Sequence, residues 1–313
     1  MTPDPSDEFA RQRALDSYRV LDTMPEQAYD DIVQLAATLC GAPIALVSLI
    51  DRDRQWAKAN IGMDETQVSR DIAFCDHAIQ QPHQLLEVPD TMRDARFSDN
   101  PFVALGDGMR FYAGMPLVTP SGCPIGTVCV ADSVPRRLND AQRAALGALS
   151  RLTINLMEAH ARERALQRAA TLHAAPAATL ASTAAATGYT VAIIEMQGYA
   201  TFVSHSGDRV AERLLEQLDA TLEACIRPAS GDVLNRATGS VECIAVIQGD
   251  DASATLEALQ RGCDMFSREN GVQVLMASAP SASPGEAPEM VFLRADEALS
   301  MEKDRLMHQA RAA

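Results

Sequence analysis

Apolar and polar positions alternate between helical and strand spacing along residues 1–138. The spacing predicts a helix that begins near Ser6 and a second that begins near Pro25, because proline suits a first helical turn. Two pairs of strands follow, each joined by a short polar turn, "DRD" or "TPSG", which is typical of a β-hairpin. The strands of the two hairpins are residues 43–50, 54–62, 110–118 and 124–132, and a further short strand is predicted at residues 84–88. An antiparallel sheet with helices on one face and long loops on the other predicts an α+β fold.

A long helical pattern follows at residues 139–170, and it opens with Asn139 and Gln142 at the spacing of a capping box. Its apolar positions step by four and three, which indicates a heptad seam. The seam positions are Ala145, Leu149, Leu152, Leu156, Ala159, Leu166 and Ala170. The helix either packs on its own domain or forms a coiled coil with the same helix of a second chain. The length of the seam favours the coiled coil and a homodimer.

The Ala/Thr-rich stretch at residues 171–188 predicts a linker. Residues 189–313 then predict buried strands at "YTVAIIEM", "VECIAVI" and "GVQVLMASAP", interleaved with amphipathic helices. The order β-α-β-α-β-α predicts a second, α/β domain.

Composition and charge exclude several classes of protein. The formal net charge of −15 and the absence of a Lys/Arg cluster argue against binding of nucleic acid or an anionic membrane, because both need basic residues. The longest apolar run is far short of the roughly 20 residues of a membrane helix, and the polar N-terminus does not resemble a secretory signal. We therefore expect a cytoplasmic protein. Its seven cysteines form no CxxC pair, so reduced thiols are the default.

Residues 1–138 carry several separated motifs that resemble the GAF family of small-molecule sensor domains. The motifs are "LDTMPEQAYDDIVQLAATLC", "FCDHAI" and "RFYAGMPLV", and the resemblance runs from about residue 7 to residue 165. It implies an antiparallel sheet of about six strands with flanking helices, and a ligand pocket between the concave face and the loops that cross it.

The candidate ligand residues lie around this implied pocket, and an arginine beside aromatic rings suits an anionic or planar ligand. They are Trp56, Cys75, Asp76, His77, Asp90, Arg110, Tyr112 and Cys129. Three structural alternatives stay open: Arg110 pairs with Asp76 or Asp90 to hold a loop, the two thiols are core residues, and His77 is a buried, hydrogen-bonded histidine. Cys75 and His77 alone are weak evidence for a metal site, so we predict no metal and no cofactor.

Residues 189–313 resemble the GGDEF family of diguanylate cyclases, through "SGDRVAERL" and "RADEALSMEK". The resemblance implies a cyclase-fold domain whose acidic residues hold Mg²⁺ against a nucleoside triphosphate. The corresponding positions here are Glu195, Gln197, Asp208, Ser240, Val241, Glu242 and Cys243.

These positions depart from the family at several points. Gln197 stands where a second acid is expected, and Ser240 and Val241 replace the paired glycines that let a phosphate approach the backbone. Arg227 is not followed three residues later by the acid of the family's inhibitory site. We predict a degenerate domain with no catalytic residue.

The sequence as a whole predicts a dimeric sensor. A GAF domain at residues 1–138 binds an unidentified small molecule, and a connecting helix and linker at 139–188 lead to a degenerate GGDEF domain at 189–313. A downstream signalling protein is then the partner of the second domain. Two alternatives from other classes are a residual diguanylate cyclase that makes cyclic di-GMP from GTP, and a thiol-based redox sensor centred on Cys75.

Overall fold

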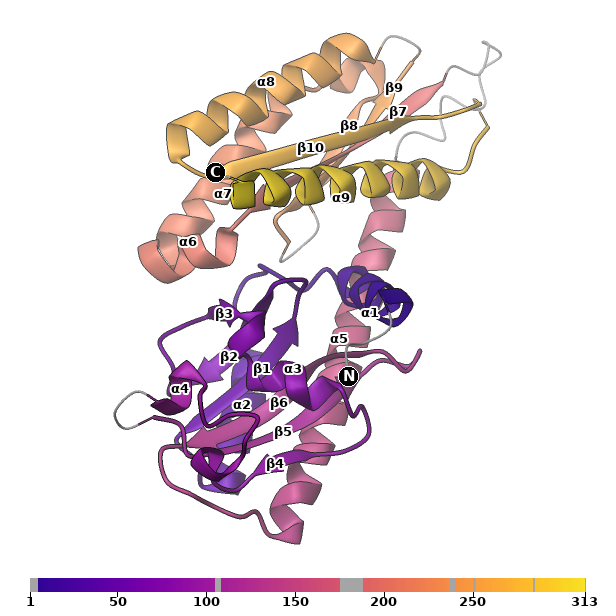
Figure 1. Cartoon of the computed structure of the whole chain (residues 1–313). Helices are drawn as coiled ribbons and strands as arrows, with labels where there is room; N and C mark the ends of the chain where they lie inside the picture. Colours follow the sequence, from indigo (N-terminus) through magenta and orange to yellow (C-terminus); the bar gives the residue numbers. More distant parts are fainter. Residues whose placement is uncertain are drawn as a thin grey trace. The chain divides into compact units, whose positions relative to one another are not determined.

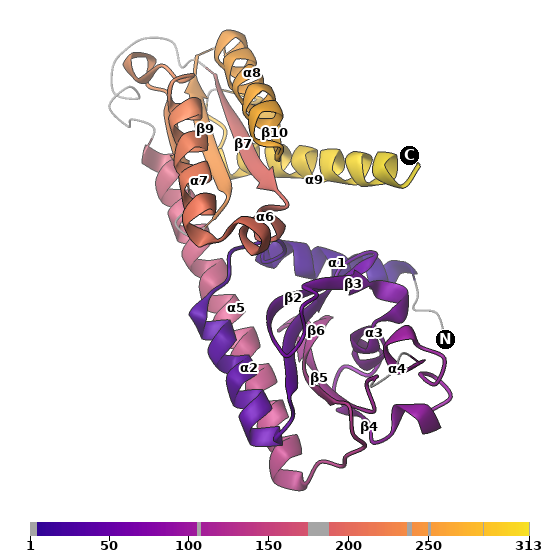
Figure 2. The ribbon, with the colours of Figure 1, turned by 90° about the vertical axis from the view of Figure 1, so that its left-hand side faces the viewer.

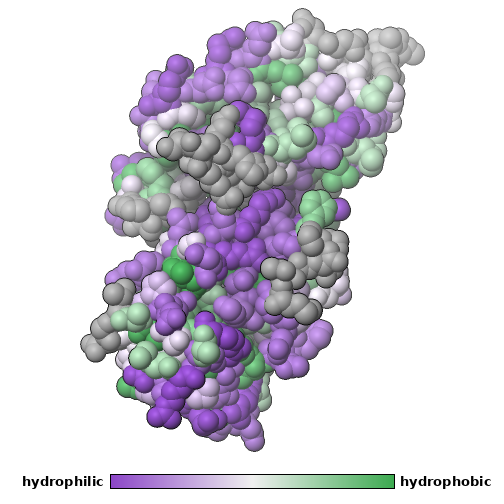
Figure 3. Space-filling model, in the orientation of Figure 1, coloured by the Kyte–Doolittle hydropathy of each residue, from purple (hydrophilic) through white to green (hydrophobic). Residues whose placement is uncertain are grey.

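The computed structural model describes residues 5–104, 108–174, 188–236, 240–249, 252–283 and 285–312. Contacts within the chain divide it into two compact units, Met1–Ala161 and Arg162–Ala313 (Figure 1). The face seen in Figure 3 is mostly hydrophilic, with small hydrophobic patches, as the charge of −15 leads one to expect. Among the described residues, no helix is both long and apolar enough to cross a membrane.

The N-terminal unit is built on a six-stranded antiparallel sheet in the order β3-β2-β1-β6-β5-β4. The strands are β1 (Ile44–Ile50), β2 (Arg54–Ile61), β3 (Gln67–Ser69), β4 (Leu86–Val88), β5 (Phe111–Val118) and β6 (Pro124–Asp132). Both predicted hairpins are present, as β1–β2 and β5–β6. The α+β expectation for this half is therefore confirmed, whereas the short strand β3 was not predicted.

Helices and loops cover the two faces of this sheet differently. The helices are α1 (Pro5–Tyr18), α2 (Gln27–Cys40), α3 (Phe74–Ile79) and α4 (Pro101–Ala104), with 3₁₀ turns at Arg70–Ile72 and Thr91–Arg93. Figure 2 shows α2 and α5 (Asp140–Ala174) on one face, and α3 and α4 with the long loops on the other. The second face is the one on which the implied pocket would lie.

Helix α5 begins with the predicted capping box. The backbone N–H of Gln142 donates to Asn139 Oδ1 at 2.9 Å, and that of Asn139 donates to Gln142 Oε1 at 3.0 Å. Residues 171–174, predicted as linker, are instead the last helical turn, because Leu172 is buried in the core of the C-terminal unit. The rest of the predicted linker, up to residue 187, lies outside the described residues. The predicted domain boundaries stay predictions.

The predicted heptad seam does not face the sheet of the N-terminal unit. Leu149 of the seam is buried, but Leu152 is 56% exposed and Leu166 is 72% exposed. The helix buries Leu146 and Met157 instead. The part of α5 in the N-terminal unit therefore packs on that unit with one face, and most of the seam positions along the helix are turned outward.

A buried lysine ties three segments of the N-terminal unit together. The Lys58 ammonium, from β2, donates to Met24 O at 2.5 Å and to Thr23 Oγ1 at 2.8 Å, and it lies 2.7 Å from Glu26 Oε1. The other oxygen of Glu26 lies 3.0 Å from Nδ1 of His160 on α5. The start of α2 is thus held between the sheet and the long helix.

The C-terminal unit has a four-stranded antiparallel sheet in the order β10-β7-β9-β8. Its elements are β7 (Tyr189–Gln197), α6 (Tyr199–Ser206), α7 (Asp208–Glu223), a 3₁₀ turn at Pro228–Ser230, β8 (Val233–Arg236), β9 (Glu242–Gln248), α8 (Ser253–Asn270), β10 (Gln273–Pro280) and α9 (Pro288–Ala312). This is a split β-α-β arrangement. The three predicted strands are confirmed, whereas strand and helix do not strictly alternate, because α6 and β8 are additions that were not predicted.

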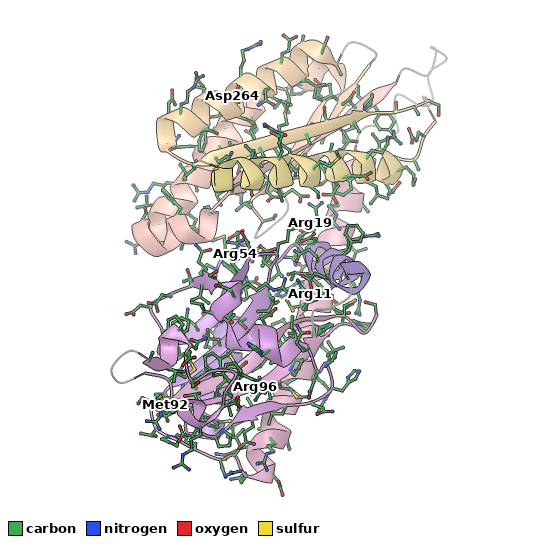
Figure 4. All side chains as sticks on the ribbon, in the orientation of Figure 1. Arg11, Arg19, Arg54, Met92, Arg96 and Asp264 are labelled. Carbon is green, nitrogen blue, oxygen red and sulfur yellow. The ribbon has the colours of Figure 1, made fainter. Side chains whose placement is uncertain are left out.

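Helix α1 is attached to the sheet of its unit by arginines. Arg11 of α1, labelled in Figure 4, donates to Ile50 O at 2.6 Å and to Glu8 Oε1 at 2.7 Å. Arg70 reaches the same Glu8 oxygen at 2.6 Å. Burial raises the pKa of Glu8, but the hydrogen bonds from these two arginines outweigh it and lower the pKa from 4.5 to about 2.

This depressed pKa predicts a pH-dependent contribution to stability. The contribution is present above pH 4.5 and is lost as the pH falls toward about 2, since the folded protein must then protonate a carboxylate held by two arginines. In the Glu8→Gln variant the free energy of unfolding should be lower at neutral pH and should fall less steeply over that window. Chemical denaturation at a series of pH values measures this, with the exposed Glu65→Gln as the matched control. Parallel pH profiles of the Glu8 variant and the parent would contradict it.

Candidate functional site

Helix α3 carries the "FCDHAI" motif across the loop-covered face of the sheet. Arg70 Nε donates to Asp76 Oδ1 at 2.7 Å, and Asn100 Nδ2 donates to Ile72 O at 2.8 Å, so side chains hold both the helix and the turn before it. The Phe74 ring stacks on the Phe97 ring with centroids 4.2 Å apart. These contacts press the next residue, Cys75, against the strands.

Cys75 lies in a buried group of thiols and hydroxyls. Its Sγ is 3.7 Å from Cys129 Sγ on β6, and the Tyr112 hydroxyl on β5 donates to it at 3.3 Å. Behind them, the hydroxyls of Ser48 on β1 and Thr127 on β6 are 3.2 Å apart. We call these five residues the thiol cluster. The two cysteines are 2% and 1% exposed, so the cluster is closed to solvent.

Strand register assembles the thiol cluster. Leu46 pairs with Cys129 and Ser48 with Thr127, and paired residues share a face of the sheet. Gly114 pairs with Cys129 on the same face. A Cβ on Gly114 would lie 2.2 Å from the Tyr112 hydroxyl oxygen, so the glycine makes room for this side chain. The glycine of "RFYAGMPLV" therefore positions the phenol against Cys75.

The two thiols differ in their ease of ionisation. Burial raises the pKa of Cys75, but the S–H of Cys129 and the hydroxyls of Ser48, Thr127 and Tyr112 can all donate to its sulfur. Together they hold the pKa of Cys75 below its ordinary value. The hydrogen bond to Cys75 and burial raise the pKa of Cys129. Cys75 is thus the thiol of the pair that ionises first.

Polar residues form the rim of this face. Arg110 Nη2 donates to Asp90 Oδ1 at 2.9 Å, and Asp90 also caps the turn at Thr91–Arg93. Of the open alternatives for Arg110, the structure contains the pairing with Asp90, while Asp76 pairs with Arg70. The Arg110 hydrogen bond, the largest effect, lowers the pKa of the Asp90 carboxyl.

His77 and Arg96 stand beside Phe97 at the same rim. His77 is exposed, so the alternative of a buried histidine does not hold, and its ring meets the Phe97 ring edge-on with centroids 4.8 Å apart. Partial desolvation by the neighbouring groups lowers the pKa of this histidine. Arg96, labelled in Figure 4, lies over the Phe97 ring at 5.0 Å and pairs with Asp94 at 2.6 Å. An imidazole and a guanidinium therefore border the apolar layer above the thiol cluster.

Trp56 does not join the other predicted ligand residues. It pairs with Leu49, and alternation along β2 puts it on the same face as Lys58, whose ammonium reaches the start of α2. Ile50 and Cys75 belong to the apolar cluster of the opposite face. The prediction that Trp56 borders the same space as Cys75 is wrong, because sequence alternation defines two faces without saying which one meets the loops.

In the C-terminal unit, three of the predicted positions come together on the face that α9 covers. Glu195 and Glu242 are cross-strand partners on β7 and β9, and Gln197 Nε2 donates to Glu195 Oε1 at 2.8 Å. Lys303 Nζ of α9 lies 2.6 Å from Glu195 Oε1 and 2.8 Å from Oε2. An ammonium from the chain itself therefore neutralises the first-strand carboxylate.

The remaining predicted positions of this unit lie apart. Ser240 Oγ accepts the backbone N–H of Glu242 at 3.1 Å, and Val241 is buried. Cys243 faces the other side of the sheet, where its thiol lies 3.7 Å from Asp219 of α7. Asp208 begins α7 directly after Gly207. Arg227 pairs at 3.4 Å with Asp232, five residues on.

Comparisons with known proteins agree with the architecture of the N-terminal unit. The family model of the GAF domain matches residues 24–155. This chain carries a GAF domain. Over 134 residues it is 40% identical to a Pseudomonas aeruginosa protein named as a cyclic di-GMP phosphodiesterase. That match covers 43% of this chain and 23% of the relative, so the chain spans about a quarter of that protein's length.

Two solved structures are similar to parts of the chain. The GAF domain of a phosphoenolpyruvate-protein phosphotransferase from Acinetobacter is 16% identical with a TM-score of 0.37, covering 48% of this chain and 95% of that one. The GGDEF domain of DgcB from Caulobacter crescentus, in complex with c-di-GMP, is 19% identical with a TM-score of 0.33. It covers 38% of this chain and 73% of that one.

Sequence reasoning missed the partners that the fold supplies. Ser48 and Thr127 read as ordinary strand residues, and nothing local indicates that they meet Cys75. Gly114 was visible within the GAF motif "RFYAGMPLV", where a glycine inside a strand indicates a close approach. Lys303 was visible in "RADEALSMEK", but its pairing with Glu195 depends on how α9 lies on the sheet.

The contact between Gly114 and Tyr112 predicts the effect of a single methyl group. Gly114→Ala should lower the free energy of unfolding by about 1–3 kcal/mol, the usual cost of overpacking a core. Thermal or urea unfolding measures it. Gly147→Ala is the matched control, since a Cβ there meets Arg151 Nη1 only at 3.6 Å and alanine favours a helix. Equal stability of the Gly114 variant and the parent would contradict the close approach.

Proposed function

We propose that this chain is a sensor in cyclic di-GMP signalling. In this proposal the GAF domain responds to a small molecule, and the C-terminal unit passes the signal on through protein contacts without turning over a nucleotide. The observation that carries the proposal is helix α5, which contributes Leu149 and Met157 to buried positions of the GAF domain and Leu172 to the core of the C-terminal unit. A helix shared by a sensor domain and a second domain suits transmission by a two-state shift.

The rim of the GAF domain supports recognition of a small anionic or planar molecule. Arg110 is about one-third exposed and pairs with the carboxylate of Asp90. An anion that replaced this carboxylate would release the turn that Asp90 caps. Cys75, Tyr112 and Cys129 are core side chains, so a ligand reaches them only if α3 or the loops move.

The outward face of the helix pair α2 and α5 supports a homodimer. The two helices are antiparallel neighbours, because Gln142 reaches Cys40 O at 3.1 Å while His160 meets Tyr29 at the other end. Leu35 and Leu39 of α2 are exposed, as is Leu152 of α5. A second copy that covered this face would remove apolar surface from water.

This face predicts the outcome of charge substitutions. The double variant Leu152→Glu/Leu166→Glu should be monomeric at concentrations where the parent is a dimer, because burying a carboxylate in an apolar interface is costly. Light scattering with size-exclusion chromatography measures the mass. The matched control is Ala144→Glu/Ala165→Glu, at exposed positions of α5 outside the seam. A monomeric parent, or a variant that remains a dimer, would remove this part of the proposal.

The carboxylates of the C-terminal unit support the absence of cyclase chemistry. Phosphoryl transfer needs metal ions held by free carboxylates. Glu195 instead receives the Lys303 ammonium and the Gln197 amide. The side chain of Val241 stands where the family resemblance implies a glycine, and Val241 is buried.

One assay distinguishes the proposed sensor from the competing function, a residual diguanylate cyclase. Incubation of the protein with GTP and Mg²⁺, followed by chromatography, should show no cyclic di-GMP. The matched Glu242→Ala variant should give the same trace, since this proposal gives Glu242 no catalytic role. Formation of product by the parent and its loss in Glu242→Ala would establish the cyclase instead.

A further inference from the structure

The thiol cluster places two reduced cysteines within reach of each other in a closed part of the GAF domain. Cys75 Sγ and Cys129 Sγ are 3.7 Å apart, although the residues are 54 positions apart in the chain. A disulfide needs an S–S distance of about 2.05 Å, so the sulfurs must approach by a little more than 1.5 Å. Side-chain rotation together with a small shift of α3, a helix of only six residues, covers this distance.

The surroundings of the pair resemble a reactive site more than an ordinary core position. Cys129 Sγ and the Tyr112 hydroxyl lie 3.7 and 3.3 Å from Cys75 Sγ, with the hydroxyls of Ser48 and Thr127 behind them, so these groups can donate to a thiolate. Cys40 is an equally buried thiol of the same domain, and burial alone raises its pKa to about 11. The contrast shows that burial by itself does not produce the environment of Cys75.

We propose that Cys75 and Cys129 form a reversible disulfide when a small hydroperoxide oxidises the thiol cluster. The Cys75 thiolate attacks one peroxide oxygen, so that an S–O bond forms, the O–O bond breaks, and the released hydroxide takes up the proton lost from Cys75 to give water. Cys129 then attacks the Cys75 sulfenic acid: the S–S bond forms, the S–O bond breaks, and the Cys129 proton leaves in a second water. One hydrogen peroxide thus oxidises two thiols, and a dithiol reductant restores them.

The burial of the thiol cluster limits the size of the oxidant that can reach Cys75. The stacked rings of Phe74 and Phe97 and the helix α3 close the thiol cluster, so a bulky disulfide such as oxidised glutathione cannot reach Cys75 Sγ without unfolding the cover. Hydrogen peroxide is about as small as two water molecules. The geometry therefore points to a small hydroperoxide as the oxidant, and Tyr112 is a positioning residue that acts through Cys75.

The chemistry is tested on the full chain, independently of ligand binding or dimerisation. The reduced protein is treated with hydrogen peroxide, quenched with an alkylating agent and digested without reductant, and linked peptides are identified by mass spectrometry. We expect a Cys75–Cys129 link that dithiothreitol removes and that oxidised glutathione does not produce. Cys40→Ser should keep the link. The proposal would be overturned if the Cys75–Cys129 link were absent under conditions that already oxidise the more exposed Cys123. Links that involve other cysteines instead would also overturn it.

The role of Tyr112 has its own readout. Tyr112→Phe keeps the ring and removes one donor to Cys75, so the pKa of the attacking thiol should rise. We expect oxidation at pH 7 to be about fivefold slower, which corresponds to a pKa rise of one unit from about 7, and the pH profile of the rate to move to higher pH. An unchanged pH profile would remove Tyr112 from the proposal. Because the link is mapped in the parent protein, the test does not depend on whether a cysteine variant folds.

Discussion

The GAF domain depends on a buried positive charge. The Lys58 side chain is fully enclosed, and its ammonium bonds to the segment that precedes α2, through Thr23, Met24 and Glu26. An enclosed charge without partners costs several kcal/mol, so this segment cannot leave the sheet cheaply. Glu26 also holds His160, and the position of α5 on its own domain therefore follows from the same charge.

Local signals predicted much of the fold. Turn residues fixed both GAF hairpins, and the Asn139–Gln142 pair fixed the start of α5. Elements whose stability comes from tertiary packing were missed: α6 read as a turn, and β8 is a strand of only four residues that pairs with β9. The exposure of the α5 seam could not be predicted from the sequence either, because an apolar stripe on a helix can pack on a sheet, on a second chain or face water.

The candidate sites show more clearly that local sequence signals do not predict tertiary contacts. Cys75, Asp90 and Arg110 lie at the loop-covered face, but the contact of Cys75 with Cys129 joins a helix and a strand that are far apart in the sequence. Glu195 was chosen by resemblance, whereas Lys303, which neutralises it, lies 108 residues away. Residue types indicated where chemistry could occur, and only the strand register and the course of α9 show which groups meet.

The thiol cluster and the Lys58 charge lie on opposite faces of one sheet, and both are linked to helix α5. Thr127 and Cys129 lie on β6, which ends at Asp132 shortly before α5 begins, while Lys58 and Glu26 hold α5 through His160. Close-packed cores do not deform continuously, so a shift of β6 is either absorbed at α3 or passed to the segment that leads into α5. α3 is short, and Arg70 and Asn100 hold it and the turn before it, whereas His160 of α5 contacts Glu26, the carboxylate that also pairs with the enclosed Lys58 ammonium. A small change at the thiols would therefore be absorbed first by α3 and the loops, and it would reach α5 only when it is large enough to move β6 itself.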